Sequence, residues 1–280
     1  MPNWKDIRKM QTILIATKVT LSLAFLLYAS WSDYKTREVT NRVWILYAPT
    51  ALLLSIAELL LYEPERLSLF GLSVGVTVII AFVLFYSGGF GGADSKALMC
   101  IAMALPFFPA TLFTPILTSG VSPLSQNIFP FTILSNSVLV AAFSGVALLL
   151  YNLFWRAKTG TKLFEGTLAN EPFWKKILVL ITGYRVPIAK LKEKWHIYPM
   201  EDIAEENGAD AGKRRLVVVP KDEGRDDVVS RLSKAVDAGK IGAKVWATPG
   251  LPMLIFVTIG LIIALLFGDI VWFLVSFAFG

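Results

Sequence analysis

The apolar residues of this chain fall into long continuous runs, not into the short periodic stretches typical of a water-soluble core. A helix needs about 20 apolar residues to cross a bilayer. Six runs approach or exceed that length, and we expect each to form a membrane-spanning helix. They cover residues 12–31, 43–62, 67–86, 97–117, 131–154 and 251–279. Pro106 and Pro109 fall inside the fourth run and predict a bend or an end of the helix there.

A polar segment separates the fifth run from the sixth. Residues 156–248 are dense in Lys, Arg, Asp and Glu and are numerous enough to fold by themselves. The pattern predicts three elements in this segment: an amphipathic helix at 172–182 suited to the membrane surface, a strand at 214–219 that ends at Pro220, and a helix at 226–238.

These patterns together predict the fold class. We expect an all-α polytopic membrane protein of six transmembrane helices, with a small α/β domain inserted before the last helix. The expected domains are a membrane domain at 1–155, a soluble cytoplasmic domain at 156–248 and the final span at 249–280.

The distribution of basic residues sets the expected orientation. The loops at 33–42 and 87–96 and the polar domain hold most of the 27 Lys and Arg residues, whereas residues 118–130 carry no charge. Because basic residues are enriched in cytoplasmic loops, we expect a plasma-membrane protein whose polar domain faces the cytoplasm. Lys5, Arg8 and Lys9 conflict with this assignment, which leaves the side of the N-terminus less firmly fixed.

The scarcity of Cys and His excludes several kinds of site. Cys100 is the one cysteine, so neither an intramolecular disulfide nor a CxxC zinc site can form. His196, the one histidine, lies in the polar domain, and no HExxH motif occurs, which argues against a metalloprotease. We expect no metal and no cofactor. The net charge of +6 is explained by membrane orientation, so we expect lipid and no nucleic acid as a partner.

Three charged residues lie in or near the runs without a clear catalytic role. Lys18 falls within the first run, where it either pairs with an acid or extends to the interface. Glu58 and Asp269 lie near the ends of the second and sixth runs, where a charge can reach the headgroups.

Two other carboxyl groups offer more chemistry. Asp33 directly follows the first run, and Asp94 directly precedes the fourth, so both fall on the expected cytoplasmic side. Two neighbouring carboxylates share a proton and titrate as one unit. One can then accept a proton from water while the other donates to an amide carbonyl, which hydrolyses a peptide bond without a metal. We therefore expect Asp33 and Asp94 to be a catalytic pair.

Glycines crowd the segment before Asp94. Gly88, Gly89, Gly91 and Gly92 allow backbone conformations barred to other residues and a close approach of substrate backbone. The alternative is a flexible connection between spans. The position of Asp94 directly after them favours the functional interpretation.

These segments resemble those of a known family. Gly91-Gly92-Ala93-Asp94 is similar to the Gly-x-Gly-Asp motif of membrane aspartyl proteases, with Ala93 in place of the second glycine. The pattern Asp33-x-Lys35-x-Arg37-x-Val39-x-Asn41 resembles the first aspartate segment of type IV prepilin peptidases. With the Trp-Ala-Thr-Pro-Gly-Leu-Pro entry to the last run at 246–252, the chain looks most like the archaeal preflagellin (archaellin) peptidases.

The resemblance carries several implications. Such enzymes remove a short basic leader from archaellin or type IV pilin-like precursors at the cytoplasmic face, beside a hydrophobic helix that remains in the product. Asp33 and Asp94 match the two catalytic aspartates. Some bacterial relatives carry paired CxxC motifs and N-methylate the product; this chain has neither those motifs nor a glycine-rich loop for a methyl donor, so we expect peptidase activity only.

Other charged residues leave alternatives open. Lys35 and Lys96, each two positions after an aspartate, either lower carboxyl pKa values and bind substrate backbone or serve as interfacial charges. The acidic residues Glu201, Asp202, Glu205 and Glu206 either receive a basic leader or are simply solvated.

Two other functions compete with a leader peptidase. A presenilin-type protease cuts within the bilayer, but Asp33 lies at the end of a run and precedes Tyr34 in place of following a tyrosine. An ion-coupled transporter would use Asp33 and Asp94 to bind ions. Transporters often show inverted repeats, and none is evident here.

Overall fold

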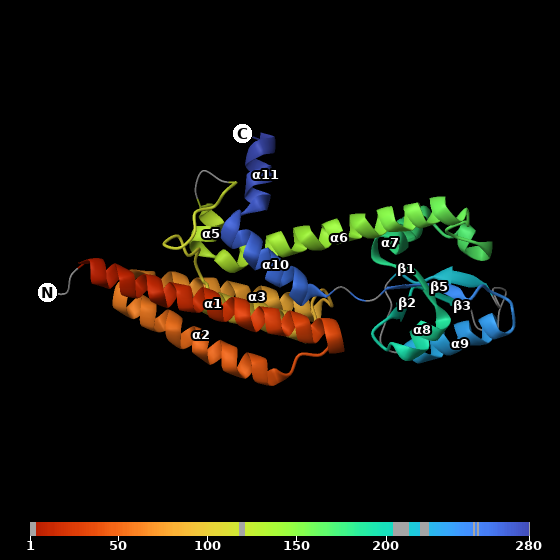
Figure 1. Ribbon diagram of the computed structural model, residues 1–280, viewed down its shortest axis with the longest axis horizontal. Coiled ribbons are helices and arrows are strands. Elements are labelled where there is room, and N and C mark those ends of the chain that lie inside the picture. The colour runs from red at the N-terminus through yellow and green to blue at the C-terminus, as the bar shows by residue number, and fades with distance from the viewer. Residues whose placement is uncertain are drawn as a thin grey trace. The chain divides into compact units, whose positions relative to one another are not determined.

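The computed structural model describes residues 4–117, 121–203, 213–218, 224–248, 250 and 252–279. The chain divides into two compact units, Met1–Ala141 with Pro252–Gly280, and Ala142–Leu251. Figure 1 labels most of the helices and strands along the chain. Most described residues are helical, and the strands belong to the second unit.

The first unit is a helical bundle. Its helices are α1 (Trp4–Thr36), α2 (Asn41–Tyr62), α3 (Leu67–Tyr86), α4 (Gly92–Ala104), the short α5 (Pro123–Asn127), the first part of α6 (Phe129–Thr159), α10 (Met253–Leu266) and α11 (Ile270–Phe279), with a 3-10 turn at Pro64–Arg66. Its main core contains Leu26, Tyr47, Ile101 and Leu261, which come from α1, α2, α4 and α10. Many other apolar side chains on these helices are exposed, as a lipid-facing surface requires.

Helix α10 completes this core although it follows the second unit in the sequence. The Ser30 hydroxyl on α1 donates to the Leu254 carbonyl (2.9 Å) and hydrogen-bonds to Thr258 (2.7 Å). A Cβ at Gly260 would lie 2.7 Å from the Ile133 carbonyl of α6, so only glycine allows this approach. The last part of the chain is therefore essential to the first unit.

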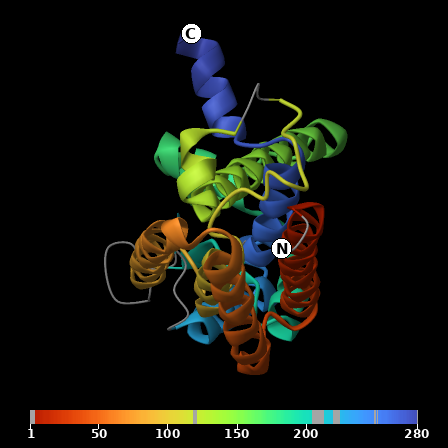
Figure 2. The same cartoon turned by 90° about the vertical axis from the view of Figure 1, so that its left-hand side faces the viewer.

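The structure does not confirm all six of the predicted membrane-spanning helices. In the described residues, four helices are long and apolar enough to cross a membrane: Asp6–Thr36, Asn41–Tyr62, Pro64–Tyr86 and Phe129–Thr159. The pair Met253–Leu266 and Ile270–Phe279 would make a fifth if it is one span, and it bends by 60°. Figure 2 shows α11 leaving α10 at an angle. The bend follows Gly268, whose φ of 84° ends α10, and Asp269 then accepts a hydrogen bond from Trp272 N–H (3.0 Å) to cap α11.

The predicted fourth span at 97–117 is wrong in its bounds. Helix α4 has 13 residues and ends at Ala104. At about 1.5 Å per residue it is roughly 20 Å long, which is short of a bilayer core. The cause is Pro106, because proline lacks the N–H that would continue the helix and disfavours helical backbone in the residue before it. The apolar residues beyond it form turns, and Phe108 N–H bonds the Ser125 carbonyl (3.0 Å).

The second unit combines the end of α6 with a small α/β structure. Its elements are a 3-10 turn at Gly166–Asn170, α7 (Phe173–Thr182), β1 (Tyr184–Pro187), α8 (Ile188–Glu193), β2 (Tyr198–Pro199), β3 (Glu201–Ile203), β4 (Arg214–Leu216), α9 (Arg225–Asp237) and β5 (Lys244–Thr248). An antiparallel sheet has the order β1-β5-β2, and β3 pairs with β4. Leu191 of α8 and Leu232 of α9 pack against Val186 and Val245.

The predicted helices of the polar segment are confirmed as α7 and α9. The strand predicted at 214–219 is confirmed as β4 only for Arg214–Leu216. Residues 217 and 218 are not part of the strand, so the predicted strand is too long, and Val219 and Pro220 lie outside the described residues.

Candidate active site

Asp33 lies in the last turn of α1, where the chain reverses toward α2. Arg37 N–H bonds the Asp33 carbonyl (2.9 Å), and Arg37 adopts a left-handed conformation with φ 58°. The Ser32 hydroxyl donates to the Glu38 carbonyl (2.7 Å), and the Thr36 hydroxyl donates to the same atom (3.0 Å). The turn after Asp33 is thus tied back to α1, which fixes the position of the partly buried carboxyl group.

Asp94 lies in the first turn of α4. Its Oδ2 accepts a hydrogen bond from the N–H of Gly91, the residue that caps the helix (2.9 Å). A Cβ at Gly91 would lie 3.1 Å from that oxygen, which is unusually close, so glycine suits the contact. Gly88 has a φ of 76°, a conformation that favours glycine. Phe90 is buried beside Leu98 and Ala81 and anchors the connecting loop.

The two aspartates are near enough to interact through their charges. Partial burial raises the pKa of Asp94 to about 6; the charge of Asp33 adds to this rise, and the Gly91 hydrogen bond opposes it. In the part of the chain that the structure describes, no hydrogen bond joins the two carboxyl groups directly. The Asp94 carboxyl therefore carries a proton near neutral pH far more often than an ordinary aspartate.

A hydrogen bond ties α4 to α2 beside this pair. Lys96 Nζ donates to Asn41 Oδ1 (2.7 Å), which joins the first turn of α4 to the first residue of α2. The start of α2, the end of α1 and the start of α4 therefore meet at one end of the first unit. Sequence alone did not assign Asn41 a role, because its partner lies 55 positions away.

Known proteins supply independent information on this chain. The model of the type IV leader peptidase family matches residues 20–150, which contain both aspartates. The model of the archaeal peptidase A24 C-terminus, type II, matches residues 175–270. The two models together cover most of the chain, which is therefore similar to the type IV leader peptidases along most of its length.

Two curated relatives agree over nearly the whole length. A preflagellin peptidase of Methanococcus voltae is 28% identical over 256 residues, which cover 89% of this chain and 94% of the relative. A preflagellin peptidase of Methanococcus maripaludis (strain C6 / ATCC BAA-1332) is 23% identical over 262 residues, which cover 90% and 96%. The resemblance to archaeal prepilin-like peptidases is confirmed, and the chain is a protease of the leader-processing kind.

The other motif residues of this leader peptidase have distinct surroundings. Lys35 lies over the Trp31 ring, 4.3 Å from its centroid. Ala93 is partly buried and packs against the main core. Gly92 lies in ordinary contact distance of Phe85.

A groove opens between α1 and α2. It has a volume of about 570 Å³, and Phe25, Tyr28 and Leu46 give it mainly apolar walls. Thr40 and Arg42 line it at the start of α2. Thr40 and Arg42 flank Asn41, the partner of Lys96, so the groove lies at the same end of the first unit as the candidate catalytic pair. Sequence alone did not single out these residues, because apolar side chains occur on every helix of the unit.

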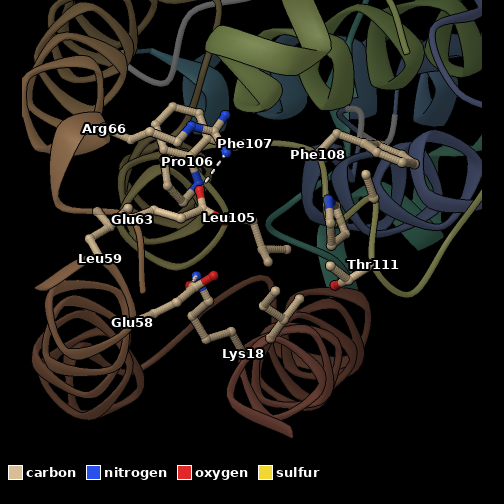
Figure 3. A pocket seen from close by; sticks show the side chains of 13 residues that line it. Lys18, Glu58, Leu59, Glu63, Arg66, Leu105, Pro106, Phe107, Phe108 and Thr111 are labelled. Carbon is tan, nitrogen blue, oxygen red and sulfur yellow. Dashed lines mark hydrogen bonds and ion pairs between the residues drawn. The ribbon is translucent and has the colours of Figure 1, made fainter. Parts of the chain in front are cut away.

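A second polar site of the leader peptidase lies elsewhere on α1. Lys18 forms an ion pair with Glu58 of α2, and Figure 3 shows the two side chains facing each other. Lys18 Nζ also donates to the Ser55 hydroxyl (3.3 Å), which in turn donates to the Ala104 carbonyl (3.2 Å). Lys18 precedes Asp33 by 15 positions, or about 22 Å along a helix. The pairing confirms one of the two interpretations of Lys18 and corrects the interfacial placement of Glu58, which is buried.

A cavity of about 100 Å³ adjoins this ion pair. At its rim, Arg66 pairs with Glu63 (2.8 Å) and stacks on the Phe107 ring, 3.9 Å from the centroid (Figure 3). The side chains therefore neutralise one another in pairs, which is typical of a structural site.

Asp269 and the acidic residues of the second unit also have internal partners. Asp269 is buried within the first unit, and its Oδ2 accepts a hydrogen bond from the Ser122 hydroxyl (3.0 Å). Glu201 pairs with Arg214 (2.7 Å), and Asp202 pairs with Arg231 (3.0 Å). These contacts leave Glu201 and Asp202 poorly placed to receive a basic leader. Glu205 and Glu206 lie outside the described residues.

Proposed function

We propose that this protein is an aspartyl endopeptidase that removes the short basic leader from archaellin or type IV pilin-like precursors at the cytoplasmic face of the plasma membrane. The single observation that carries the mechanism is that Asp33, at the end of α1, and Asp94, at the start of α4, lie at one end of the first unit, where the Lys96–Asn41 hydrogen bond (2.7 Å) joins α4 to α2. The pKa of Asp94, raised to about 6 by burial and by the charge of Asp33, is in keeping with this arrangement. The names of the relatives, both preflagellin peptidases, support preflagellin as the precursor.

The proposed reaction uses the two carboxyl groups in opposite roles. The ionised member accepts a proton from a water molecule, whose oxygen attacks the carbonyl carbon of the peptide bond. The protonated member donates its proton to the carbonyl oxygen, which gives a neutral tetrahedral intermediate. Collapse of this intermediate breaks the C–N bond as the nitrogen takes up a proton. Asp94 is suited to hold the shared proton because its pKa is raised to about 6.

The surroundings of the pair suit a substrate with an apolar segment beside its cleavage site. The groove lined by Phe25, Tyr28 and Leu46 lies at the same end of the first unit as Asp33 and offers apolar contact area. We propose that it receives the beginning of the hydrophobic helix that remains in the mature subunit. The scissile bond would then lie at the end of this helix, near Asp33 and Asp94.

The decisive experiment replaces each aspartate by asparagine and follows cleavage of a preflagellin in membranes by its shift on a gel. General acid–base groups contribute about 10²–10⁴-fold to rate, so Asp33→Asn and Asp94→Asn should each lose at least about a hundredfold. Asp6→Asn, at an exposed position of α1, is the matched control and should keep the full rate. Wild-type cleavage by either catalytic variant would contradict the aspartyl mechanism.

A further inference from the structure

Helix α7 carries an apolar face that is exposed among the described residues of the second unit. Phe173 is 77% exposed, Trp174 is 56% exposed and Ile177 is 38% exposed. The opposite side is packed, because Val179 is fully buried beside Leu168 and Trp246. Exposed aromatic and aliphatic residues at positions i, i+1 and i+4 form one face of a helix. A water-soluble surface rarely leaves such residues uncovered together.

The cations of α7 have partners at the border of this face. Lys175 pairs with Glu171 (2.9 Å), and Lys176 Nζ donates to the Ala169 carbonyl. Lys175 also lies 6.0 Å from the centroid of the Trp174 ring. A helix with apolar residues on one side and lysines at its border is typical of a segment that lies in the plane of a membrane interface.

The end of α7 is fixed to a helix that is itself apolar enough to cross a membrane. Asn152 of α6 is buried, and its Nδ2 donates to the carbonyls of Leu180 (2.9 Å) and Gly183 (2.8 Å). A Cβ at Gly145 of α6 would lie 3.3 Å from the Ile181 carbonyl, which shows how closely the two helices approach. The carbonyls at the end of a helix need partners where water is scarce, and Asn152 supplies them.

The position of these contacts along α6 indicates how deep in the bilayer the end of α7 lies. Arg156 and Lys158 form the basic end of α6. Asn152 precedes Arg156 by four positions, or about 6 Å, and Gly145 precedes it by about 16 Å along the helix. The headgroup region of a bilayer is only about 5–8 Å thick on each side. With Arg156 among the headgroups, Asn152 lies at the edge of the hydrocarbon and Gly145 lies inside it.

The same part of α6 has an uncovered apolar stripe of its own. Phe143, Val146, Leu150 and Phe154 follow one another at helical spacing and are each more than half exposed. A stripe of this kind within a candidate span is a lipid-contacting surface. This stripe indicates that the part of α6 that contacts the end of α7 lies in lipid. The stripe is independent of the exposed apolar residues of α7 itself.

We propose that α7 is an interfacial membrane helix that inserts Phe173, Trp174 and Ile177 into the lipid on the side of the α6 basic end and so holds the second unit on the bilayer. The occupant of the exposed face is lipid because α7 is joined to a lipid-contacting segment of α6. The polar part of the chain that stands free of the membrane then begins at β1, not directly after α6.

The test places a nitroxide label at single cysteines in a Cys100→Ser background, in the full chain reconstituted into vesicles of phosphatidylcholine and phosphatidylglycerol. Labels at Trp174→Cys and Ile177→Cys should collide more often with oxygen, which concentrates in lipid, than with a water-soluble nickel chelate. The matched control, Ser230→Cys, is exposed on α9 of the same unit and should show the reverse. Cleavage of preflagellin at the parental rate verifies that each variant is folded.

Two outcomes would overturn the proposal. Nickel accessibility at 174 and 177 equal to that at 230 would place α7 in water. Low accessibility to both reagents would mean that protein, such as a second copy or the precursor, covers the face. Asn152→Ala tests the attachment separately: it should increase the mobility of the label at 174 and leave the label at 230 unchanged.

Discussion

Lys18 of α1 and Glu58 of α2 form an ion pair with side chains only 6% and 10% exposed. Removing one member of a buried pair leaves an uncompensated charge, which costs about 3–5 kcal/mol. Glu58→Ala should therefore strongly lower the unfolding temperature in detergent. The double variant Lys18→Met/Glu58→Leu should recover most of the loss, because apolar residues of similar size remove both charges. Equal destabilisation by the single and double variants would show that the charges themselves do not matter.

The raised pKa of Asp94 makes a prediction about stability. The folded protein binds this proton more tightly than the unfolded chain, so Asp94 lowers stability as the pH rises from about 4 to about 6. The full shift corresponds to about 3 kcal/mol, and residual solvent contact reduces this to about 2 kcal/mol. Asp94→Asn keeps an oxygen for the Gly91 N–H and removes the charge.

The variant should therefore unfold at a higher temperature than the wild type at pH 7, with the difference vanishing near pH 4. Differential scanning fluorimetry across this range measures the effect. A variant that unfolds at a lower temperature than the wild type at pH 7 would mean that the pKa of Asp94 is lowered, contrary to its surroundings.

The hydrogen bond from Lys96 to Asn41 should affect kcat more than the binding of the precursor. Lys96→Met removes the donor that ties α4 to α2 and so loosens the position of Asp94. We expect a roughly tenfold lower kcat with little change in KM, since small displacements of catalytic groups reduce rate. Asn41→Asp keeps an acceptor and should retain near-normal kcat. Lys35→Met, which removes the contact with Trp31, is the matched control. A rise in KM alone would instead make Lys96 a substrate-binding residue.

The groove between α1 and α2 should govern substrate binding. Leu46 is 62% exposed within the groove, and Ile45 is 68% exposed beside it on the same helix. Leu46→Trp should fill the groove and raise KM for preflagellin severalfold at an almost unchanged kcat. Ile45→Trp adds the same volume outside the groove and should have no effect. Identical kinetics for the two variants would remove the groove from substrate binding.

The side of the membrane that carries the catalytic pair can be determined by labelling. In a Cys100→Ser background, Glu38→Cys reports on the turn next to Asp33, and Glu65→Cys reports on the turn between α2 and α3; both positions are exposed. A membrane-impermeant maleimide should label Glu65→Cys in intact cells and Glu38→Cys only after permeabilisation. The opposite result would place Asp33 outside the cytoplasm.

The sequence predicted the helices best where apolar runs are free of breaks. Residues 43–62 and 67–86 match α2 and α3 closely, even though Pro49 lies inside α2. The span predicted at 97–117 is wrong beyond Ala104, because apolar composition does not distinguish a helix from apolar turns packed in the bundle. The sequence also predicted that the two aspartates lie on the same side of the membrane, because Asp94 follows the third apolar run after only a short connection and Asp33 follows the first run. The pairing of Lys18 with Glu58 and of Lys96 with Asn41 depends on the register between helices, which a single sequence does not reveal.

The dependence of the first unit on α10 affects how the enzyme is made. Ribosomes produce α1 and α4, with both aspartates, long before α10, which must await synthesis of the whole second unit. Leu254, Val257 and Leu261 fill the centre of the bundle, so the nascent chain carries an open core until its penultimate helix is inserted. A product that stops short of α10 retains both aspartates and lacks the packing that supports them. The bundle that holds the two aspartates can therefore close only after the second unit has been synthesised.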